Sequence, residues 1–503
     1  MGVVKFAASL TVCAVAIVAL LIAPPALYGR DACLSCHQTL SDKPSALFAH
    51  DVHRLRGISC AGCHGGDPAS DEMERAMSKE AGFIGVPKGD AISLMCASCH
   101  SDSARMHDLH SSLPTDQFGN LQQSVHGRLS LSGGERIVQC TTCHRAHGIA
   151  PVQDPSSPVG PLHIVATCSG CHSNAAFIRS YNPRLPVDQL DKYRTSVHGQ
   201  KNAAGDAHVA ECASCHGSHL ILPAKDVRSR VYPTNLPGTC ASCHSDRVRM
   251  KSYGIPTDQF AKYQKSVHGV ALLEKGDLGA PACNGCHGNH GATPPGVASI
   301  SKVCGTCHAL NADLFSTSPH KRAFDQAGLP ECETCHGNHD IAPPSSQMLG
   351  VGSDAVCVRC HSAGEDNGGY RTALIMRSLA DSLIRAESSA TERADEAEQK
   401  GMEISEAKFR LRDVRQAHME ARTMVHAFDA ARYSAVVSKG LITAGTISQE
   451  ATRMIQEYYF RRIGLGIATL IITLLAVSLY LYIRRLERAQ RASRPATDEA
   501  HKE

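Results

Sequence analysis

The chain contains eleven copies of the pattern Cys-x-x-Cys-His, and this repetition restricts its fold more than any other feature. About 30 residues separate successive copies, which is too few for each segment to bury an ordinary hydrophobic core. Of the 23 cysteines only Cys13, in an apolar N-terminal segment, lies outside the pattern. The cysteine pairs are Cys33 and Cys36, Cys60 and Cys63, Cys96 and Cys99, Cys140 and Cys143, Cys168 and Cys171, Cys212 and Cys215, Cys240 and Cys243, Cys283 and Cys286, Cys304 and Cys307, Cys332 and Cys335, and Cys357 and Cys360. The histidines that complete the copies are His37, His64, His100, His144, His172, His216, His244, His287, His308, His336 and His361.

This pattern has a specific chemistry, the covalent attachment of haem c. The two thiols form thioethers with the haem vinyl groups, and the histidine that follows binds the iron as the proximal ligand. A zinc site would need two cysteine pairs that converge on one tetrahedral centre, and zinc gives no reason for a histidine after every pair. The sequence therefore predicts eleven covalently attached haem c groups, each of which also supplies the apolar surface that its short segment lacks.

Part of the chain is an internal repeat with a step of 72 residues, starting at Cys96, Cys168 and Cys240. In each copy a Pro-x-Asp-Gln segment predicts the start of a helix, and a Ser-Val-His-Gly segment its end. Each copy then supplies a second haem motif, followed three residues after its histidine by another histidine, as in CHRAH, CHGSH and CHGNH. One repeat is therefore predicted to hold two haems.

The repeated histidines outside the motifs are the predicted second (distal) iron ligands. Leu47 and Phe48 precede His53 by the same step as Leu314 and Phe315 precede His320, which favours His53 over His50 in the first pair. The predicted distal ligands are His53, His126, His147, His198, His219, His268, His290, His320 and His339. The candidates for the remaining haems are His50, His107, His110, His163, His208, His418 and His426. Methionine has no regular place relative to the motifs, so His/His ligation and low potentials are expected.

Apolar segments near both ends of the chain indicate export and membrane attachment. Lys5 and the apolar run that follows it predict a signal segment, either cleaved or kept as a second anchor. Residues 463–483 are uncharged and long enough to span a bilayer. The arginines that follow predict a cytoplasmic tail, so the haems are expected in the periplasm on a chain held in the inner membrane.

The predicted fold is mainly α with little regular structure around the haems: short helices and loops wrapped around stacked c-type haems, then a long helical hairpin and one C-terminal transmembrane helix. Residues 370–460 contain no proline and predict helices that fold back around Gly401. If His418 or His426 binds a haem, these helices also cap the last haems and connect the electron path to the membrane surface. The predicted divisions are a signal or anchor (1–29), a first di-haem unit (30–95), three di-haem repeats (96–167, 168–239 and 240–303), a shortened di-haem unit with the eleventh haem (304–369), the hairpin or stalk (370–460), the transmembrane helix (463–483) and the tail (484–503).

The eleven motifs, the SVHG and CHGNH elements and the ARTMVHAFD segment carry a family resemblance. From residue 33 to about 430 the chain resembles the multihaem c-type cytochromes of respiratory bacteria grouped as cytochrome c3-like or doubled-CXXCH proteins. The resemblance implies an electron carrier whose partners are a quinol-oxidising membrane subunit and periplasmic or outer-surface cytochromes. The chain is also similar to tetrahaem quinol dehydrogenases in its single-helix anchor, and to multihaem nitrite and hydroxylamine enzymes in its C-terminal helices.

These observations predict electron transfer between a membrane, quinol-linked donor and periplasmic or extracellular acceptors, by a carrier and not by a catalyst of substrate chemistry. The alternative is a multihaem reductase of the nitrite, hydroxylamine or sulfur oxyanion type, with one five-coordinate haem. That haem is expected at Cys60 or Cys357, because neither motif has an evident local distal histidine. A structural filament of stacked haems is disfavoured by the anchor. The formal charge of +3 omits the haem propionates, and without a basic patch interleaved with aromatics nucleic acid is not an expected partner.

Overall fold

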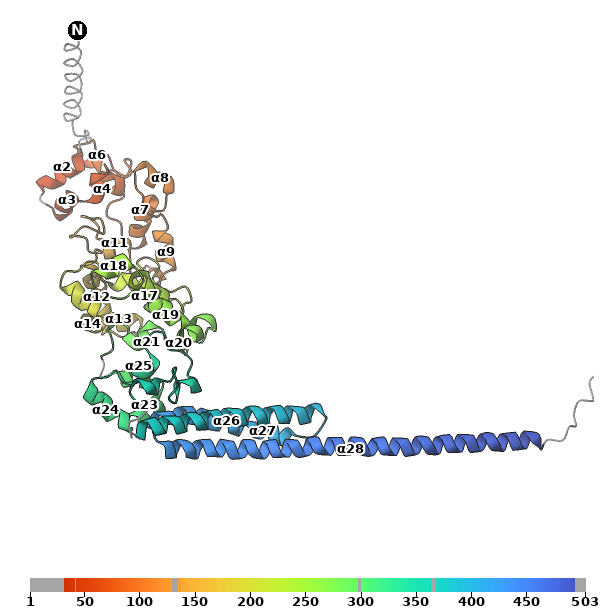
Figure 1. Ribbon diagram of the computed structural model, residues 1–503. Helices are drawn as coiled ribbons and strands as arrows, with labels where there is room; N and C mark the ends of the chain where they lie inside the picture. Colours follow the sequence, from red (N-terminus) through yellow and green to blue (C-terminus); the bar gives the residue numbers. More distant parts are fainter. Residues whose placement is uncertain are drawn as a thin grey trace, which may run out of the picture. The chain divides into compact units, whose positions relative to one another are not determined.

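The computed structural model describes residues 31–40, 42–128, 134, 136–296, 300–362 and 368–493. The chain divides into two compact units, Met1–Pro294 and Pro295–Glu503. The described residues are mainly helical and form no strands, which confirms the predicted fold class. Short helices joined by loops make up the first unit, and three long helices dominate the second (Figure 1). The predicted signal segment, residues 1–29, lies outside the described residues.

The helices of the first unit are short because most of them contain little more than a haem motif or a distal histidine with its cap. They are α2 (Ala32–Thr39), α3 (Lys43–Phe48), α4 (Val52–Leu55), α5 (Ala61–His64), α6 (Met73–Ala76), α7 (Asp90–His100), α8 (Ser103–Asp108), α9 (Gln117–Gln123), α10 (Val125–Arg128), α11 (Cys140–His144), α12 (Ile164–His172), α13 (Ala175–Tyr181), α14 (Gln189–Thr195), α15 (Val197–Ala203), α16 (Cys212–His216), α17 (Leu236–His244), α18 (Arg247–Lys251), α19 (Gln259–Lys265), α20 (Val267–Gly269), the π-helix η1 (Val270–Glu274) and α21 (Cys283–His287). The apolar core of this unit is small: Tyr263, Leu272 and Ala282 form its one cluster of buried residues among those described. Apolar surface on haems is needed to hold segments of this kind together.

The second unit begins with the same kind of short element and continues into long helices. Its elements are α22 (Ile300–Gly305), α23 (Ala309–Ser316), α24 (Pro319–Ala327), α25 (Glu331–His336), the 3₁₀ helices η3 (Ser346–Met348) and η4 (Val356–Arg359), α26 (Gly368–Gln399), α27 (Ser405–Met424), the 3₁₀ helix η5 (Val425–Ala427) and α28 (Ala430–Ala492). Helices α26 and α27 pack against each other and against the first half of α28 (Figure 1). These three segments are called the three-helix bundle below.

The bundle has a hydrophobic core of its own. In α28 the buried side chains follow a spacing of four and three residues, from Tyr433 and Val437 through Ala444 and Ile447 to Ala451. This spacing is that of a coiled-coil seam, and the many alanines let the helices approach closely. The core is completed by residues of α26, of α27 and of the position just before α27: Met376, Leu383, Ala390, Ala394, Ala397, Ile404, Ala407, Leu411, Val414 and Ala421.

Two reversals of the chain create the bundle. The predicted turn at Gly401 is present, with a φ of +76° that favours glycine. A second reversal follows at η5, where Phe428 adopts a φ of +49°. The second half of the predicted hairpin is therefore two separate helices, and the returning helix α28 is continuous with the predicted transmembrane segment.

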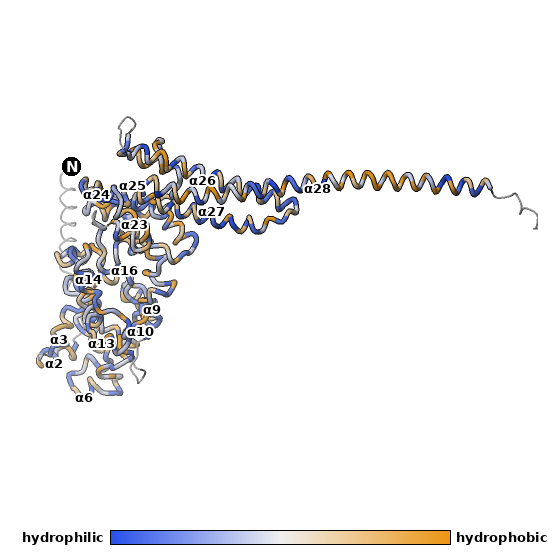
Figure 2. The backbone as a smooth tube through the Cα atoms, turned by 90° about the horizontal axis from the view of Figure 1, so that it is seen from below, coloured by the Kyte–Doolittle hydropathy of each residue, from blue (hydrophilic) through white to orange (hydrophobic). Residues whose placement is uncertain are grey.

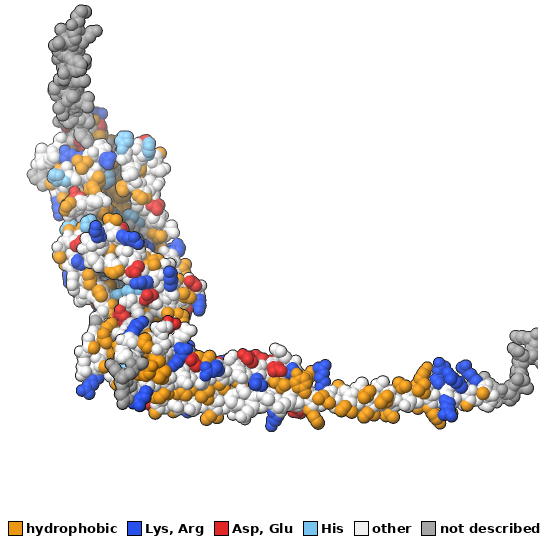
Figure 3. Space-filling view, in the orientation of Figure 1, with side chains coloured by type: hydrophobic (Ala, Val, Ile, Leu, Met, Phe, Trp, Pro, Cys, Tyr) orange, Lys and Arg blue, Asp and Glu red, His pale blue; other side chains and the backbone are white. Residues whose placement is uncertain are grey.

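Beyond the bundle α28 is exposed and apolar. It is the one helix among those described that is long and apolar enough to cross a membrane. Figure 2 shows the change from mixed to hydrophobic residues along this helix, and Figure 3 shows Lys and Arg gathered near its far end. Aromatic residues flank the apolar stretch, with Tyr458 and Tyr459 before it and Tyr480 and Tyr482 inside its last turns. Tyrosines at both ends are typical of segments whose ends lie at membrane–water interfaces.

Candidate haem sites

The second haem motif of each repeat lies on a short helix that ends at the motif histidine. After α16 and α21 the next residue is a glycine with positive φ, at Gly217 (+80°) and Gly288 (+83°). Arg145 adopts the same conformation (+66°) after α11. This left-handed residue turns the chain away from the helix, so the histidine two residues later points in a new direction. The CHG part of the CHGSH and CHGNH motifs is therefore a helix stop that separates the motif histidine from the second histidine.

The SVHG segment presents its histidine through a tight capped turn. In the third copy the Ser266 hydroxyl donates to the Tyr263 carbonyl at 2.7 Å and accepts from the Gly269 N–H at 3.0 Å. A Cβ added to Gly269 would lie 1.9 Å from the Tyr263 carbonyl oxygen, so only glycine fits there. The same contacts recur in the other two copies, at Ser124 with Gly127 and Ser196 with Gly199. The serine and the glycine thus fix the turn from which the histidine projects.

The first di-haem unit uses an aspartate where the repeats use this serine. Asp51, only 2 % exposed, caps α4 and accepts from the His53 backbone N–H at 2.9 Å and the Ile149 N–H at 2.8 Å. Its carboxylate also contacts Nδ1 of the His53 ring at 2.8 Å. Burial alone would raise the pKa of Asp51, but these hydrogen bonds outweigh it and the pKa lies below its ordinary value. Asp51-Val52-His53 is therefore a charged variant of the SVHG turn.

Eight motif histidines each face one other imidazole at a nearly constant distance. The ring centroids of each pair are 6.0 or 6.1 Å apart. The pairs are His100 with His53, His64 with His147, His172 with His126, His144 with His219, His244 with His198, His216 with His290, His361 with His320, and His336 with His426.

This constancy fits two imidazoles on opposite sides of one haem iron. The angle between the ring planes varies from 13° to 88° while the distance does not change, whereas aromatic rings in direct contact change distance with orientation. Two metal–nitrogen bonds of roughly 2 Å, plus about 1 Å from each nitrogen to its ring centre, give a separation of about 6 Å at any rotation around the axis. The residues present therefore fit six-coordinate haem c at these eight motifs.

The pairs join neighbouring repeats. His126, from the repeat that starts at Cys96, faces His172 of the next repeat, and His147 of the same repeat faces His64 of the preceding unit. His198 and His219 repeat this arrangement one step later. The repeats that start at Cys96 and Cys168 thus offer their SVHG histidine to the following repeat and their CHxxH histidine to the preceding unit.

The two motifs expected to lack a distal ligand have imidazoles opposite them. His64, of the Cys60 motif, faces His147, which lies 83 residues later. His361, of the Cys357 motif, faces His320. The expectation of an open haem at either motif counted only histidines close in sequence, and the opposing residues come from elsewhere in the chain.

The remaining predicted histidines fall into three groups. His268 lies on α20, in the place that His198 has on α15, and His339 follows α25. Of the reserve candidates, His426 is the one that faces a motif histidine among the described residues, and its Nδ1 contacts the Thr423 carbonyl at 2.9 Å. The others lie elsewhere: His163 contacts the Pro155 carbonyl, His418 contacts Glu387 at 2.9 Å, and His50, His107, His110 and His208 are exposed.

The sequence did not predict which haem sites the residues that follow α27 contact. His418 itself lies outside the buried core of the bundle, and its neighbour Ala417 is buried. Beyond η5, the Phe428 ring lies 3.8 Å from the His320 ring, centre to centre. His426 and Phe428 thus support two adjacent sites, those of the Cys332 and Cys357 motifs, and the ARTMVHAFD segment was the signal for both.

Burial keeps most of the paired imidazoles neutral, which is the form that binds iron. Loss of hydration is the largest cause, and in several pairs the facing imidazole adds to it. The histidines whose pKa is lowered in this way are His100, His126, His144, His147, His172, His198, His216, His219, His244, His290, His320, His336 and His426.

The motif cysteines form an unbroken series within each unit. In four places the first cysteines of two successive motifs are close neighbours: Cys96 and Cys140, Cys168 and Cys212, Cys240 and Cys283, and Cys304 and Cys332. In five other places burial raises the pKa of a motif thiol, and the nearby thiol of a neighbouring motif raises it further: Cys33 and Cys60, Cys63 and Cys99, Cys143 and Cys171, Cys215 and Cys240, and Cys335 and Cys357. Because each thiol marks a vinyl edge of its haem, neighbouring haems would meet along these contacts.

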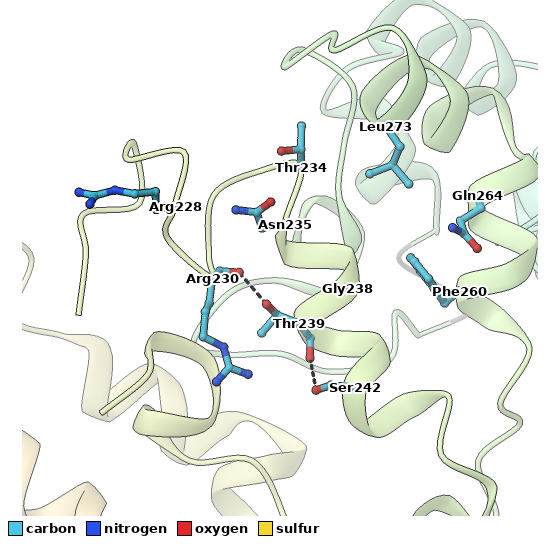
Figure 4. Close-up of a pocket in the computed structure, with 10 residues that line it drawn as sticks. All are labelled: Arg228, Arg230, Thr234, Asn235, Gly238, Thr239, Ser242, Phe260, Gln264 and Leu273. Carbon is cyan, nitrogen blue, oxygen red and sulfur yellow. Dashed lines mark hydrogen bonds between the residues drawn. The ribbon is translucent and has the colours of Figure 1, made fainter. Parts of the chain in front are cut away.

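A surface concavity next to one motif suits the polar edge of a haem (Figure 4). It lies along α17, which carries the Cys240 motif, and its lining includes Arg228, Arg230, Thr239 and Phe260. Guanidinium groups suit carboxylates such as haem propionates, and Phe260 offers apolar surface. No cysteine of the motifs forms a disulfide, so all 22 remain available for thioethers in the described part of the chain.

Comparisons with known proteins agree with this chemistry. Residues 52–173 match the family model described as Cytochrome c3. A 217-residue stretch is 23% identical to the C-type polyheme cytochrome OmcC of Geobacter sulfurreducens, covering 38% of this chain and 26% of that protein. The chain thus matches about a quarter of the length of this relative, and no solved structure matches it. With the motifs and the imidazole pairs, these matches support a multihaem c-type cytochrome that transfers electrons.

Proposed function

We propose that the protein is an undecahaem electron conduit that carries electrons between a quinol-linked donor of the inner membrane and periplasmic or extracellular acceptors. The observation that carries the proposal is the succession of neighbouring motif cysteines within each of the two units, in combination with the eight facing imidazole pairs. Haems bound at these cysteines supply the redox chemistry. The chain would hold neighbouring haems close together, and at eight motifs two histidines face each other where they could bind one iron.

The length of the three-helix bundle would determine how far the haems of such a conduit lie from the membrane. Between Ala430 and Tyr458 helix α28 runs for about 42 Å at ~1.5 Å per residue. His426, which faces His336, lies at one end of this length. At the other end the Lys400 ammonium lies 5.5 Å from the Tyr458 ring and 5.2 Å from the Tyr459 ring, where the apolar segment begins. A haem at Cys332 would therefore be too far from the bilayer to meet a quinol inside it, and the donor should project a redox group of its own.

Orientation follows from charge. Arg484, Arg485, Arg488 and Arg491 follow the apolar stretch, and only Arg461 and Arg462 precede it closely. The excess of arginines beyond the span favours a cytoplasmic C-terminus and haems in the periplasm.

The proposal is tested by interrupting the middle of the series. His219 faces His144 of the Cys140 motif, so His219→Met should raise the potential of one haem in the series, because Met/His ligation has a higher potential than His/His ligation. In membrane vesicles containing the full chain, reduction by quinol and reoxidation by a ferric chelate should slow by at least about tenfold, the cost of ~1.4 kcal/mol in the path.

The matched control is His163→Met, which changes a histidine that contacts a backbone carbonyl, and this variant should leave the rate unchanged. Mass spectrometry should find eleven haems on both variants. A lower mass of His219→Met would show that haem attachment at Cys140 has weakened. An unchanged rate for His219→Met with all haems present would contradict a single-file conduit.

A further inference from the structure

The first haem motif differs from the eight motifs whose histidines face a second imidazole. His37, of the Cys33 motif, has no imidazole opposite it among the residues that the structure describes. Its side chain is 47% exposed, compared with 25% for His53, which faces His100. His50, the nearest other histidine in sequence, is also exposed and forms no ring pair within the described ranges.

Instead, the His37 ring contacts a carboxylate. Its Nδ1 contacts the Asp42 carboxylate at 2.5 Å. If Nε2 binds iron, Nδ1–H donates to Asp42, and the imidazole gains anionic character. His64 and His426 place backbone carbonyls at this position, those of Gly85 and Thr423. His53 also contacts a carboxylate there, that of Asp51, but it faces a second imidazole.

The contact between His37 and Asp42 is built into the fold. Asp42 caps α3, where it accepts from the Ser45 N–H at 2.9 Å, and the Ser45 hydroxyl donates to the His37 carbonyl at 3.3 Å. Asp31 caps α2 from the other side and also accepts from the Cys60 N–H at 3.5 Å. The motif segment is thus fixed at both ends and joined to the second motif, so the position of the His37 ring is determined without a distal ligand.

We infer that the iron of the Cys33 haem keeps one axial position open and binds a small π-accepting ligand with a free lone pair, of about the size of a diatomic molecule. An electron-rich proximal imidazole favours such a ligand, because electron density from the ring passes through the iron to the bound molecule. The thiols of Cys33 and Cys60 are neighbours, so a bound ligand would communicate with the conduit through the Cys60 haem. The inference does not depend on the direction of electron flow, and it moves the open haem of the reductase hypothesis from Cys60 or Cys357 to Cys33.

The test is spectroscopic and uses the full haem-loaded chain. Ferrous protein exposed to carbon monoxide should bind one equivalent per chain, and ferric protein should give a high-spin signal of one haem in low-temperature electron paramagnetic resonance. Wholly low-spin spectra without carbon monoxide binding would overturn the inference.

Two matched variants identify the haem. Asp42→Asn keeps the cap of α3 but offers a neutral partner to His37, so the iron–histidine stretching frequency of the five-coordinate ferrous haem should fall in resonance Raman spectra. Asp51→Asn makes the same change behind His53, on a haem with two imidazoles, and should leave that frequency unchanged. If Asp51→Asn moves the frequency and Asp42→Asn does not, the open iron is not at Cys33.

A third variant tests the nearest competing ligand. His50→Ala should bind the same single equivalent of carbon monoxide as the unaltered chain. Binding that appears only after His50 is removed would mean that His50 normally occupies the iron, and this too would overturn the inference.

Discussion

The haem-bearing region, residues 31–362, and the three-helix bundle solve the same problem of stability in different ways. The bundle buries a continuous seam of aliphatic side chains, including Leu383, Val414 and Val437. The haem-bearing region has one small apolar cluster among its described residues, around Leu272. Its repeats are joined by facing imidazoles and by backbone hydrogen bonds such as Val125 N–H to the Ile221 carbonyl at 2.9 Å. The bundle is therefore stabilised by its own side chains, whereas the haem-bearing region depends on its cofactor.

The difference also affects how far a local change spreads. Within the first unit each repeat contacts its neighbours in sequence, as in repeat proteins whose stability is a sum of nearest-neighbour terms. In the bundle one core contains residues of all three helices, and the helices are expected to unfold together.

The largest expected effect follows from withholding haem. A full chain made without haem attachment should lose nearly all structure in residues 31–362, because about 30 residues per motif cannot bury a core alone. The bundle should stay helical. Limited proteolysis with mass spectrometry should then leave a protected fragment that contains α26 to α28, and circular dichroism should retain the helical signal of that fragment alone. Protected fragments from within residues 31–294 would show that the haem-bearing region folds on its own.

A second large effect tests whether neighbouring repeats supply histidine ligands to each other's haems. A chain cut to residues 96–239 keeps four haem motifs, but only two of their facing pairs, His126 with His172 and His144 with His219, lie wholly inside it. The partners of His100 and His216 are His53 and His290, which the cut removes. Electron paramagnetic resonance should therefore find two low-spin and two high-spin haems. Four low-spin haems would mean that each repeat supplies its own ligands.

The sequence alone predicted the histidines but not their partners. The SVHG and CHxxH positions are visible because three copies align, and the spacing of Ser266 and Gly269 already indicates a capped turn. The partner of a given histidine depends on how one repeat packs on the next, and no short-range spacing carries that information. For this reason His147 was not connected with His64, nor His426 with His336.

The sequence predicted a helical hairpin where the structure has a three-helix bundle, and the reason for this difference is another one. Its third helix was present in the sequence as Tyr433, Val437, Gly440, Ala444 and Ile447, with a spacing of four and three residues. A seam rich in alanine and glycine is only weakly apolar. Its place in a core follows from the two other helices that pack against it. The apolar span beyond it was evident without the structure, because uncharged runs of this length are rare in other contexts.

A smaller effect, confined to the bundle, comes from filling its tightest contact. A Cβ added to Gly440 would lie 2.7 Å from Leu383 Cδ1 and 2.9 Å from Ala417 Cβ. Leu383 can rotate, but Ala417 cannot, so α27 must shift and Gly440→Ala should destabilise the bundle by about 1–3 kcal/mol. Thermal unfolding followed by circular dichroism measures the loss, and haem absorption should keep its original transition.

The control for this change lies on the same helix. A Cβ added to Gly445 meets nothing within 4 Å, so Gly445→Ala should stabilise the helix by about 0.5–1 kcal/mol. If Gly440→Ala also lowered the temperature at which the haem-bearing region unfolds, the two regions would be one cooperative unit and the contrast between them would fail.

The smallest expected effect lies in a repeat contact that does not touch a haem ligand directly. The Tyr193 hydroxyl donates to the Ala210 carbonyl at 2.9 Å, which ties α14 to the start of the Cys212 motif, and Tyr263 makes the same bond to Pro281 at 2.9 Å. The first repeat has Leu121 at this place and lacks the bond. Tyr193→Phe should cost about 1 kcal/mol, so amide exchange in α15, which carries His198, should quicken by about fivefold while exchange in the bundle stays the same. Tyr193→Leu, which copies the first repeat, should lose the same bond together with some packing and exchange faster still. Equal exchange in all three proteins would mean that the imidazole pairs alone hold the repeats together, without help from the polypeptide contacts between them.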